Sequence, residues 1–98
     1  RGELAAAIQE YERAIALRLK TPEVHPILLA RARAALAETL VAASPRSPQA
    51  RERAAREAAE AAALFKSEGD YGAAELADLE SWRREVGLVD AAPTTATP

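Results

Sequence analysis

The sequence contains no cysteine, no methionine and no asparagine, and four of its 98 residues are aromatic. Without cysteine the chain has neither disulfides nor thiolate ligands for a metal ion. β-branched residues are sparse, so a sheet has little from which to form. No apolar run approaches the roughly 20 residues that span a bilayer, and no signal peptide is visible. These absences predict a helical, cytoplasmic chain without a membrane segment.

The abundant residues are alanine, with 26 copies, and arginine, with 11 copies against two lysines. Alanine, leucine, glutamate and arginine lose little side-chain entropy in a helix, so this composition favours helix. The net charge is −2, and both signs are interspersed along the chain. The basic stripe that nucleic-acid binding requires is therefore missing. The preference for arginine over lysine is typical of a GC-rich bacterial genome.

Apolar spacing predicts four helices and hence an all-α fold. Their ranges are about Glu3–Lys20, Pro26–Ala43, Pro48–Ser67 and Tyr71–Val86. The apolar stripe of the first helix consists of Leu4, Ile8, Tyr11, Ile15 and Leu19. The second helix is apolar on two sides, which predicts that it lies between neighbours. We expect residues 1–87 to form the helical unit and residues 88–98, rich in alanine, proline and threonine, to form a tail.

The third predicted helix has an alanine face, which favours close helix packing, and a charged face. The charged face offers three i,i+4 ion pairs: Glu52–Arg56, Arg53–Glu57 and Arg56–Glu60. Ser47 is expected to cap this helix, and Asp70 is expected to cap the last one. Tyr71 and Trp82 are expected to anchor the last helix in the core.

Three segments resemble parts of the tetratricopeptide repeat. "GELAAAIQEYERAIAL" resembles its second helix, with Gly2, Ala7, Tyr11 and Ala14 at matching positions. "HPILLARARAALAETLVAA" is similar to the first helix of the kinesin-light-chain-like variant, and "EAAALFKSEGDYGAAE" carries the Gly-Asp-Tyr turn. The resemblance implies about four antiparallel helices stacked as hairpins at the C-terminal end of a repeat array. It also implies a preceding helix that completes the hairpin of Gly2.

The last predicted helix departs from the repeat pattern at two positions. Asp78 stands where the pattern has an aromatic residue, and Glu75 stands where it has an apolar one. Both changes place polar groups on the side that would stack on a further repeat. The resemblance therefore implies that this helix is a solvent-facing cap.

Residues with catalytic chemistry do not form a recognisable arrangement in the sequence. His25 is the only histidine and is expected to begin a helix. Glu10 and Glu12 diverge on a helix, and Glu57 and Glu60 are expected to pair with arginines. General acid–base catalysis would need carboxylates held in a pocket in contrasting environments. We therefore expect no enzyme activity, no cofactor and no metal site.

The sequence predicts a non-catalytic scaffold that binds a protein or peptide, and neither nucleic acid nor a membrane. Upstream repeats of the same chain, or a second copy paired through the first helix, are the expected partners. The candidate partner-binding residues are Leu4, Ile8, Tyr11, Ile15, Arg31, Arg51 and Arg56. Two alternatives remain open: a regulatory segment of a bacterial signalling enzyme such as a serine/threonine protein kinase, and a structural homo-oligomer.

Overall fold

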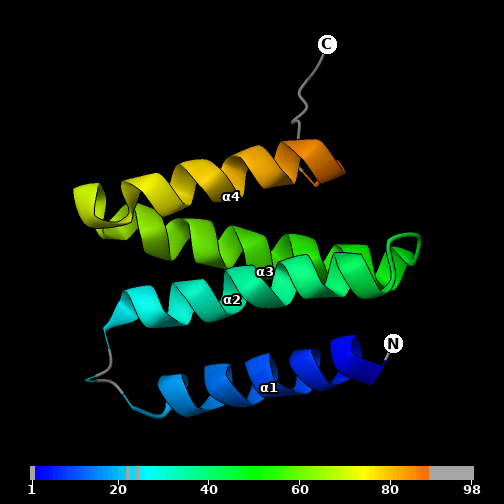
Figure 1. Cartoon of the computed structure of the whole chain (residues 1–98). Helices are drawn as coiled ribbons and strands as arrows, with labels where there is room; N and C mark the ends of the chain where they lie inside the picture. The colour runs from blue at the N-terminus through cyan, green and yellow to red at the C-terminus, as the bar shows by residue number, and fades with distance from the viewer. Residues whose placement is uncertain (1, 22, 24, 89–98) are drawn as a thin grey trace.

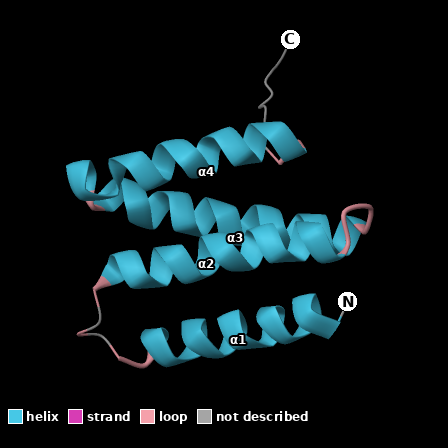
Figure 2. Cartoon of the chain, viewed as in Figure 1, coloured by secondary structure: helices cyan, strands magenta, loops and turns pink. Residues whose placement is uncertain are grey.

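Four α-helices follow one another along the chain, as Figure 1 shows. They are α1 (Gly2–Leu19), α2 (Pro26–Ala43), α3 (Pro48–Ser67) and α4 (Ala73–Val86), with a short 3-10 helix, η1 (Gly69–Gly72), before α4. The computed structural model describes residues 2–21, 23 and 25–88. Within these ranges helices and loops are the only secondary structure (Figure 2). The prediction of an all-α fold with four helices is confirmed.

The helices pack in chain order, and successive helices run in opposite directions (Figure 1). α2 packs against α1 on one side and against α3 on the other, and α4 packs against α3. α2 therefore lies between neighbours, as its two apolar sides predict. In the part of the chain that the structure describes, no helix combines the length and apolar character needed to cross a membrane.

The centre of the core is the contact between α2 and α3, and it is made largely of alanine. The fully buried residues here include Ala30, Leu36 and Ala37 of α2 and Ala54, Ala58 and Ala61 of α3. Alanine side chains let the two helix axes approach toward the short end of the usual range, about 8 Å. Larger side chains then close the ends of this contact, with Ile27 and Phe65 each 2% exposed.

Side-chain caps fix where α2 and α3 begin. His25 Nδ1 accepts a hydrogen bond from the backbone N–H of Ile27 at 3.1 Å. Ser47 Oγ accepts one from the backbone N–H of Ala50 at 3.2 Å. Each cap satisfies an amide that has no partner inside the helix, and each precedes a proline that needs none. The predicted roles of His25 and Ser47 are both confirmed.

Gly87 ends α4 with a left-handed conformation, φ 77°. The backbone N–H of Leu88 then donates to the carbonyl of Arg83 at 2.8 Å, which is the closing hydrogen bond of a Schellman motif. Leu88 is 9% exposed and belongs to the core, although it is the first residue of the predicted tail. The remainder of that tail, residues 89–98, lies outside the described residues.

The start of α4 differs from the prediction. The α-helix begins at Ala73 rather than Tyr71, because η1 occupies the preceding turn. Asp70 makes no capping hydrogen bond, so its predicted role is wrong. Tyr71 is 65% exposed and is not a core anchor. Trp82 is half-buried and packs against the core, as expected.

The reason for this turn is a close approach between two backbones. Gly72 is buried, and a Cβ placed on it would lie 2.5 Å from the carbonyl oxygen of Phe65. The chain therefore passes α3 here with no room for a side chain. The tight 3-10 turn brings Gly72 to that position and leaves the preceding Tyr71 outside the core.

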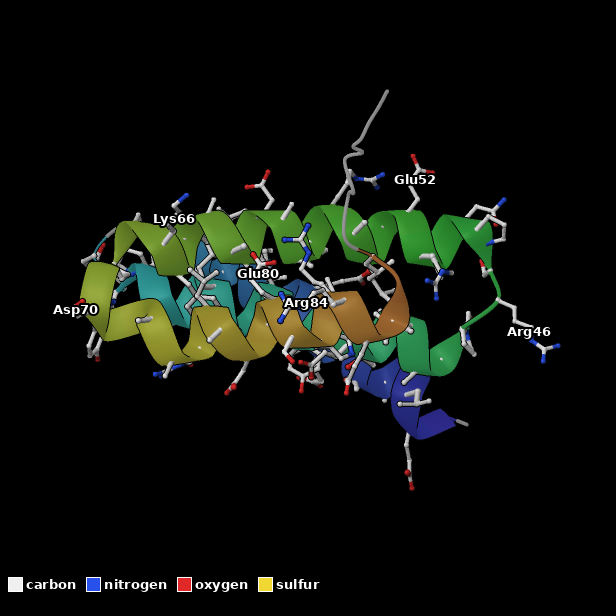
Figure 3. The ribbon with its side chains drawn as sticks, turned by 90° about the horizontal axis from the view of Figure 1, so that it is seen from above. Arg46, Glu52, Lys66, Asp70, Glu80 and Arg84 are labelled. Carbon is white, nitrogen blue, oxygen red and sulfur yellow. The ribbon has the colours of Figure 1, made fainter. Side chains whose placement is uncertain are left out.

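Of the three pairs predicted within α3, ion pairs between helices replace one, Arg53–Glu57, and another, Arg56–Glu60, is not formed. Arg53 Nη2 lies 2.7 Å from Glu12 Oε2 of α1, and Glu57 Oε1 lies 2.8 Å from Arg33 Nη1 of α2. The predicted Glu52–Arg56 pair is present at 3.7 Å. In the view of Figure 3, the labelled Glu52 and Lys66 point away from the bundle.

Candidate functional site

A hollow of about 360 Å³ lies between α1 and α2, and we call it the α1–α2 hollow. It is lined by Tyr11, Ala14 and Arg18 of α1 and by Leu28, Arg31, Ala32 and Ala35 of α2. The alanines leave this space unfilled because their side chains end at Cβ. Leu28 is 37% exposed and, with Tyr11, supplies most of the larger apolar surface. The hollow thus combines an apolar floor with two guanidinium groups.

α1 is attached to the bundle mainly through α2. Ile15 is 8% exposed, and the half-buried Ile8 and Tyr11 also pack against the core. The ion pair between Glu12 and Arg53 adds a link to α3. No other helix of the described residues lies over the flank of α1 that borders the hollow. This flank is therefore open to a partner.

A second hollow, of about 220 Å³, lies beside the first, and we call it the α2–α4 hollow. Its lining residues are Arg31, Ala34, Ala35, Glu38, Phe65, Glu75, Asp78 and Leu79. Arg31 and Ala35 belong to both linings, so the two hollows adjoin along α2. Three carboxylates line the second hollow, whereas none lines the first.

Arg31 and Glu75 form a two-pronged ion pair at the boundary between the hollows. Arg31 Nε donates to Glu75 Oε2 at 2.6 Å, and Nη2 donates to Oε1 at 3.2 Å. The hydrogen bonds to this carboxylate raise the pKa of Arg31. Since the guanidinium is already engaged, Arg31 acts here as a bridge between α2 and α4.

Glu38 of α2 is one of the carboxylates that line the α2–α4 hollow. Burial raises the pKa of Glu38 above its ordinary value of 4.5. No hydrogen bond or ion pair joins its carboxylate to another described residue. The charged form of Glu38 is thus less favourable in the folded chain than in water.

The predicted partner-binding residues do not form one continuous surface. Leu4, Ile8 and Tyr11 are half-buried on the side of α1 that faces α2, and Ile15 is buried there. Tyr11 also lines the α1–α2 hollow from α1, and Arg31 lines it from α2. The structure thus brings two of the predicted residues, Tyr11 and Arg31, into one hollow.

The other two predicted arginines lie elsewhere. Arg51 donates to the carbonyl of Pro45 at 3.2 Å and to the carbonyl of Val86, so it joins the α2–α3 loop to the end of α4. Arg56 is exposed and pairs with Glu52 along α3. Neither arginine borders the α1–α2 hollow.

His25 joins two loops at one end of the bundle. Its Nε2 lies 3.6 Å from Glu68 Oε1, and its ring meets the ring of Tyr71 edge-on at 5.2 Å between centroids. Together with its capping hydrogen bond, these contacts engage both ring nitrogens, while the side chain stays 48% exposed. Among the described residues, no three histidine, aspartate or glutamate side chains are grouped in a way that could hold a metal ion.

Sequence reasoning missed several residues of the α1–α2 hollow, namely Ala14, Arg18, Leu28, Ala32 and Ala35. One signal could have indicated part of this set. Ala14 and Arg18 follow Tyr11 at steps of three and four, which places them beside it on the same flank of α1. Leu28 is 37% exposed although it is a leucine, and it lies in the first turn of α2.

Comparison of the chain with protein-family models, with curated proteins and with solved structures finds no match.

Proposed function

We propose that this chain is a non-catalytic protein-interaction module that binds a helical segment of a partner protein in the α1–α2 hollow. The observation that carries the proposal is the open flank of α1, which borders an apolar hollow and has no described helix over it. The hollow exposes apolar surface of Tyr11 and Leu28 between two guanidinium groups. An apolar floor inside a rim of charged groups is the general composition of a protein-interaction site.

A helix is the form of partner that suits this hollow best. Two parallel or antiparallel helices create a groove along their length, and a third helix fills such a groove by packing apolar residues spaced at i, i+3, i+4 and i+7. The small residues Ala14, Ala32 and Ala35 allow its backbone to come close. The resemblance to tetratricopeptide repeats supports the same proposal, because stacked helices of that kind present grooves to protein partners. A cytoplasmic, bacterial signalling setting is part of the proposal.

The test is a selection of helical peptides from a displayed library on the immobilised wild-type chain. We expect the selected peptides to bind the wild-type chain and to lose at least tenfold in affinity on Ala14→Glu, which places a carboxylate in the hollow. Ala16→Glu is the matched control. Ala16 is exposed two residues away, on the side of α1 that faces Arg53, and it borders a different hollow.

The binding of the selected peptides to the two variants decides whether the α1–α2 hollow is the site. Peptides that bind both variants as well as the wild-type chain would show that the α1–α2 hollow is not the site, and the proposal would be wrong. Circular dichroism of both variants verifies that α1 remains folded. Glutamate is a good helix former, so neither change should disturb the helix by its propensity alone.

A further inference from the structure

We propose that the partner of the α1–α2 hollow is a second copy of this chain, whose α1 lies antiparallel against the first α1. This inference rests on the proposed function, because it names the helix that occupies the same hollow. It is carried by the order of four residues along the open flank of α1: Glu3, Ala7, Ala14 and Arg18.

These four residues share one face of the helix. At 100° per residue they fall within a sector of about 60°. Ala14 and Arg18 line the hollow, Ala7 is half-buried beside them, and Glu3 is exposed near the N-terminus of α1. The sector therefore runs along the open flank from an acidic end to a basic end, with two alanines between.

The four positions are symmetric about the middle of α1. Glu3 lies as far before the midpoint between Glu10 and Tyr11 as Arg18 lies after it, and Ala7 and Ala14 are related in the same way. When two such helices lie antiparallel about that midpoint, Glu3 of each copy faces Arg18 of the other. A two-fold axis generates both contacts at once, because the same patch serves both copies.

The charges at the two ends of this face have no partners within the described chain. Glu3 forms no ion pair there, and the guanidinium of Arg18 reaches only the backbone carbonyl of Ala14, at 3.4 Å. By contrast, Arg31, Arg33 and Arg53 each pair with a glutamate of another helix. An antiparallel copy supplies Glu3 where Arg18 lacks a carboxylate.

A parallel arrangement would bring like charges together at both ends of the helix pair. It would also align the two helix dipoles unfavourably, whereas the antiparallel arrangement opposes them. The alanines permit a close approach of the two helices. Ala7 of one copy faces Ala14 of the other, so the two axes approach to about 8 Å and the second α1 settles into the hollow over Leu28.

The first experiment measures the mass of the intact chain by sedimentation equilibrium. We expect the wild-type chain to reach twice its 10.4 kDa as its concentration rises toward about 1 mM. Glu3→Arg and Arg18→Glu should each weaken the dimer about tenfold, because each turns two attractions into two repulsions. Mixing the two variants should restore the dimer, since both contacts then join opposite charges.

Four outcomes of the sedimentation experiment would overturn the inference. A wild-type chain that stays at 10.4 kDa overturns the inference, as does a trimer or larger assembly. A wild-type dimer that neither charge reversal weakens also overturns it, and so does a mixture that remains as weak as its two components. Each variant is examined by circular dichroism, so that loss of α1 is recognised as such.

The second experiment tests the direction of the helices. The chain has no cysteine, so Ala7→Cys and Ala14→Cys each introduce a single thiol. In an antiparallel dimer, equivalent thiols are separated by seven residues, about 10 Å along the helix. That distance exceeds the reach of a disulfide, which needs Cα atoms roughly 4.4–6.8 Å apart. Oxidation should therefore link the two variants to each other and neither to itself.

Self-linking of Ala7→Cys at the rate of the mixture would indicate a parallel pair and overturn the inference. This failure is distinguishable from failure of the proposed function. A monomeric chain that binds selected peptides in the α1–α2 hollow would exclude self-pairing alone. A monomeric chain whose selected peptides also ignore Ala14→Glu would exclude both.

Discussion

Replacing Gly72 by alanine tests whether α4 is attached through a backbone contact with α3. The added Cβ would lie 2.5 Å from the carbonyl oxygen of Phe65 and 3.1 Å from its Cα. Both atoms belong to the backbone of α3, so no side-chain rotation relieves the clash. The segment that carries Gly72 must move away from α3, and α4 must follow it.

The substitution overpacks the interior, and overpacking lowers the free energy of unfolding by about 1–3 kcal/mol in well-packed proteins. We expect a value near the upper end, about 2–3 kcal/mol, because the obstacle is backbone. A domain of this length has a free energy of unfolding of roughly 5–15 kcal/mol. One kcal/mol corresponds to a melting temperature shift of about 4–8 °C, so Gly72→Ala should lower the melting temperature by about 10–20 °C.

Gly69→Ala is the matched control, three residues earlier in the same turn. Gly69 has a φ of 62°, and no atom lies within 4 Å of an added Cβ. Its substitution should cost about 1 kcal/mol, from left-handed backbone strain alone. Urea unfolding followed by circular dichroism gives both values. The fluorescence of Trp82, the single tryptophan, reports on α4 directly. If Gly72→Ala costs no more than Gly69→Ala, the close approach is not what positions α4.

Three further substitutions test other contacts. Trp82→Ala should destabilise the chain by about 2 kcal/mol, which is less than the roughly 3–5 kcal/mol of a fully buried aromatic because Trp82 is half-buried. An unchanged thermal melt would show that its ring does not hold α4 in place. Since burial raises the pKa of Glu38, stability falls as the pH rises from 4.5 through the folded-state pKa. Glu38→Gln should therefore raise the melting temperature at pH 7 and leave it unchanged near pH 3. The opposite pattern would show that burial does not raise the pKa of Glu38. Arg51→Ala should lower the free energy of unfolding by about 1–3 kcal/mol, because it removes hydrogen bonds to the carbonyls of Pro45 and Val86. Urea unfolding measures this loss against Arg46→Ala, the exposed control, and equal losses for the two variants would refute the role of Arg51.

The sequence predicted the bounds of α2 and α3 to the residue because local chemistry determines them. Each helix begins with a proline that follows a capping side chain, and neither signal depends on distant residues. The start of α4 depends on the approach of Gly72 to Phe65 of α3, a contact that no local pattern reveals. The same reason explains why Asp70, a good capping residue by type, makes no cap.

The ion pairs show the same division between local and distant information. Glu52 and Arg56 pair along one helix, and their spacing predicts it. Arg53 has an equally good local partner in Glu57 but pairs with Glu12 of α1 instead. The placement of neighbouring helices determines which carboxylate an arginine pairs with. The sequence of one helix does not contain that placement.

The candidate site was predictable only in part. The apolar stripe identified the side of α1 that faces α2, and Tyr11 lies at its edge. A stripe specifies which side of a helix is buried, but a hollow forms where small residues of two helices meet. Ala14 of α1 and Ala35 of α2 are 21 positions apart in the sequence, and only the packing of the two helices brings them into one lining.

The alanine contact between α2 and α3 has a mechanical consequence. Alanine has no side-chain torsion, so Ala30, Ala37, Ala54 and Ala58 have no alternative rotamers through which the contact could rearrange. The two helices are therefore expected to shift as one rigid body, while the contacts of α1 and α4 contain longer side chains that can adjust. A displacement of α2 from the α1 side is therefore expected to carry α3 with it. The middle pair of helices thus serves as the fixed frame against which the two outer helices can tilt.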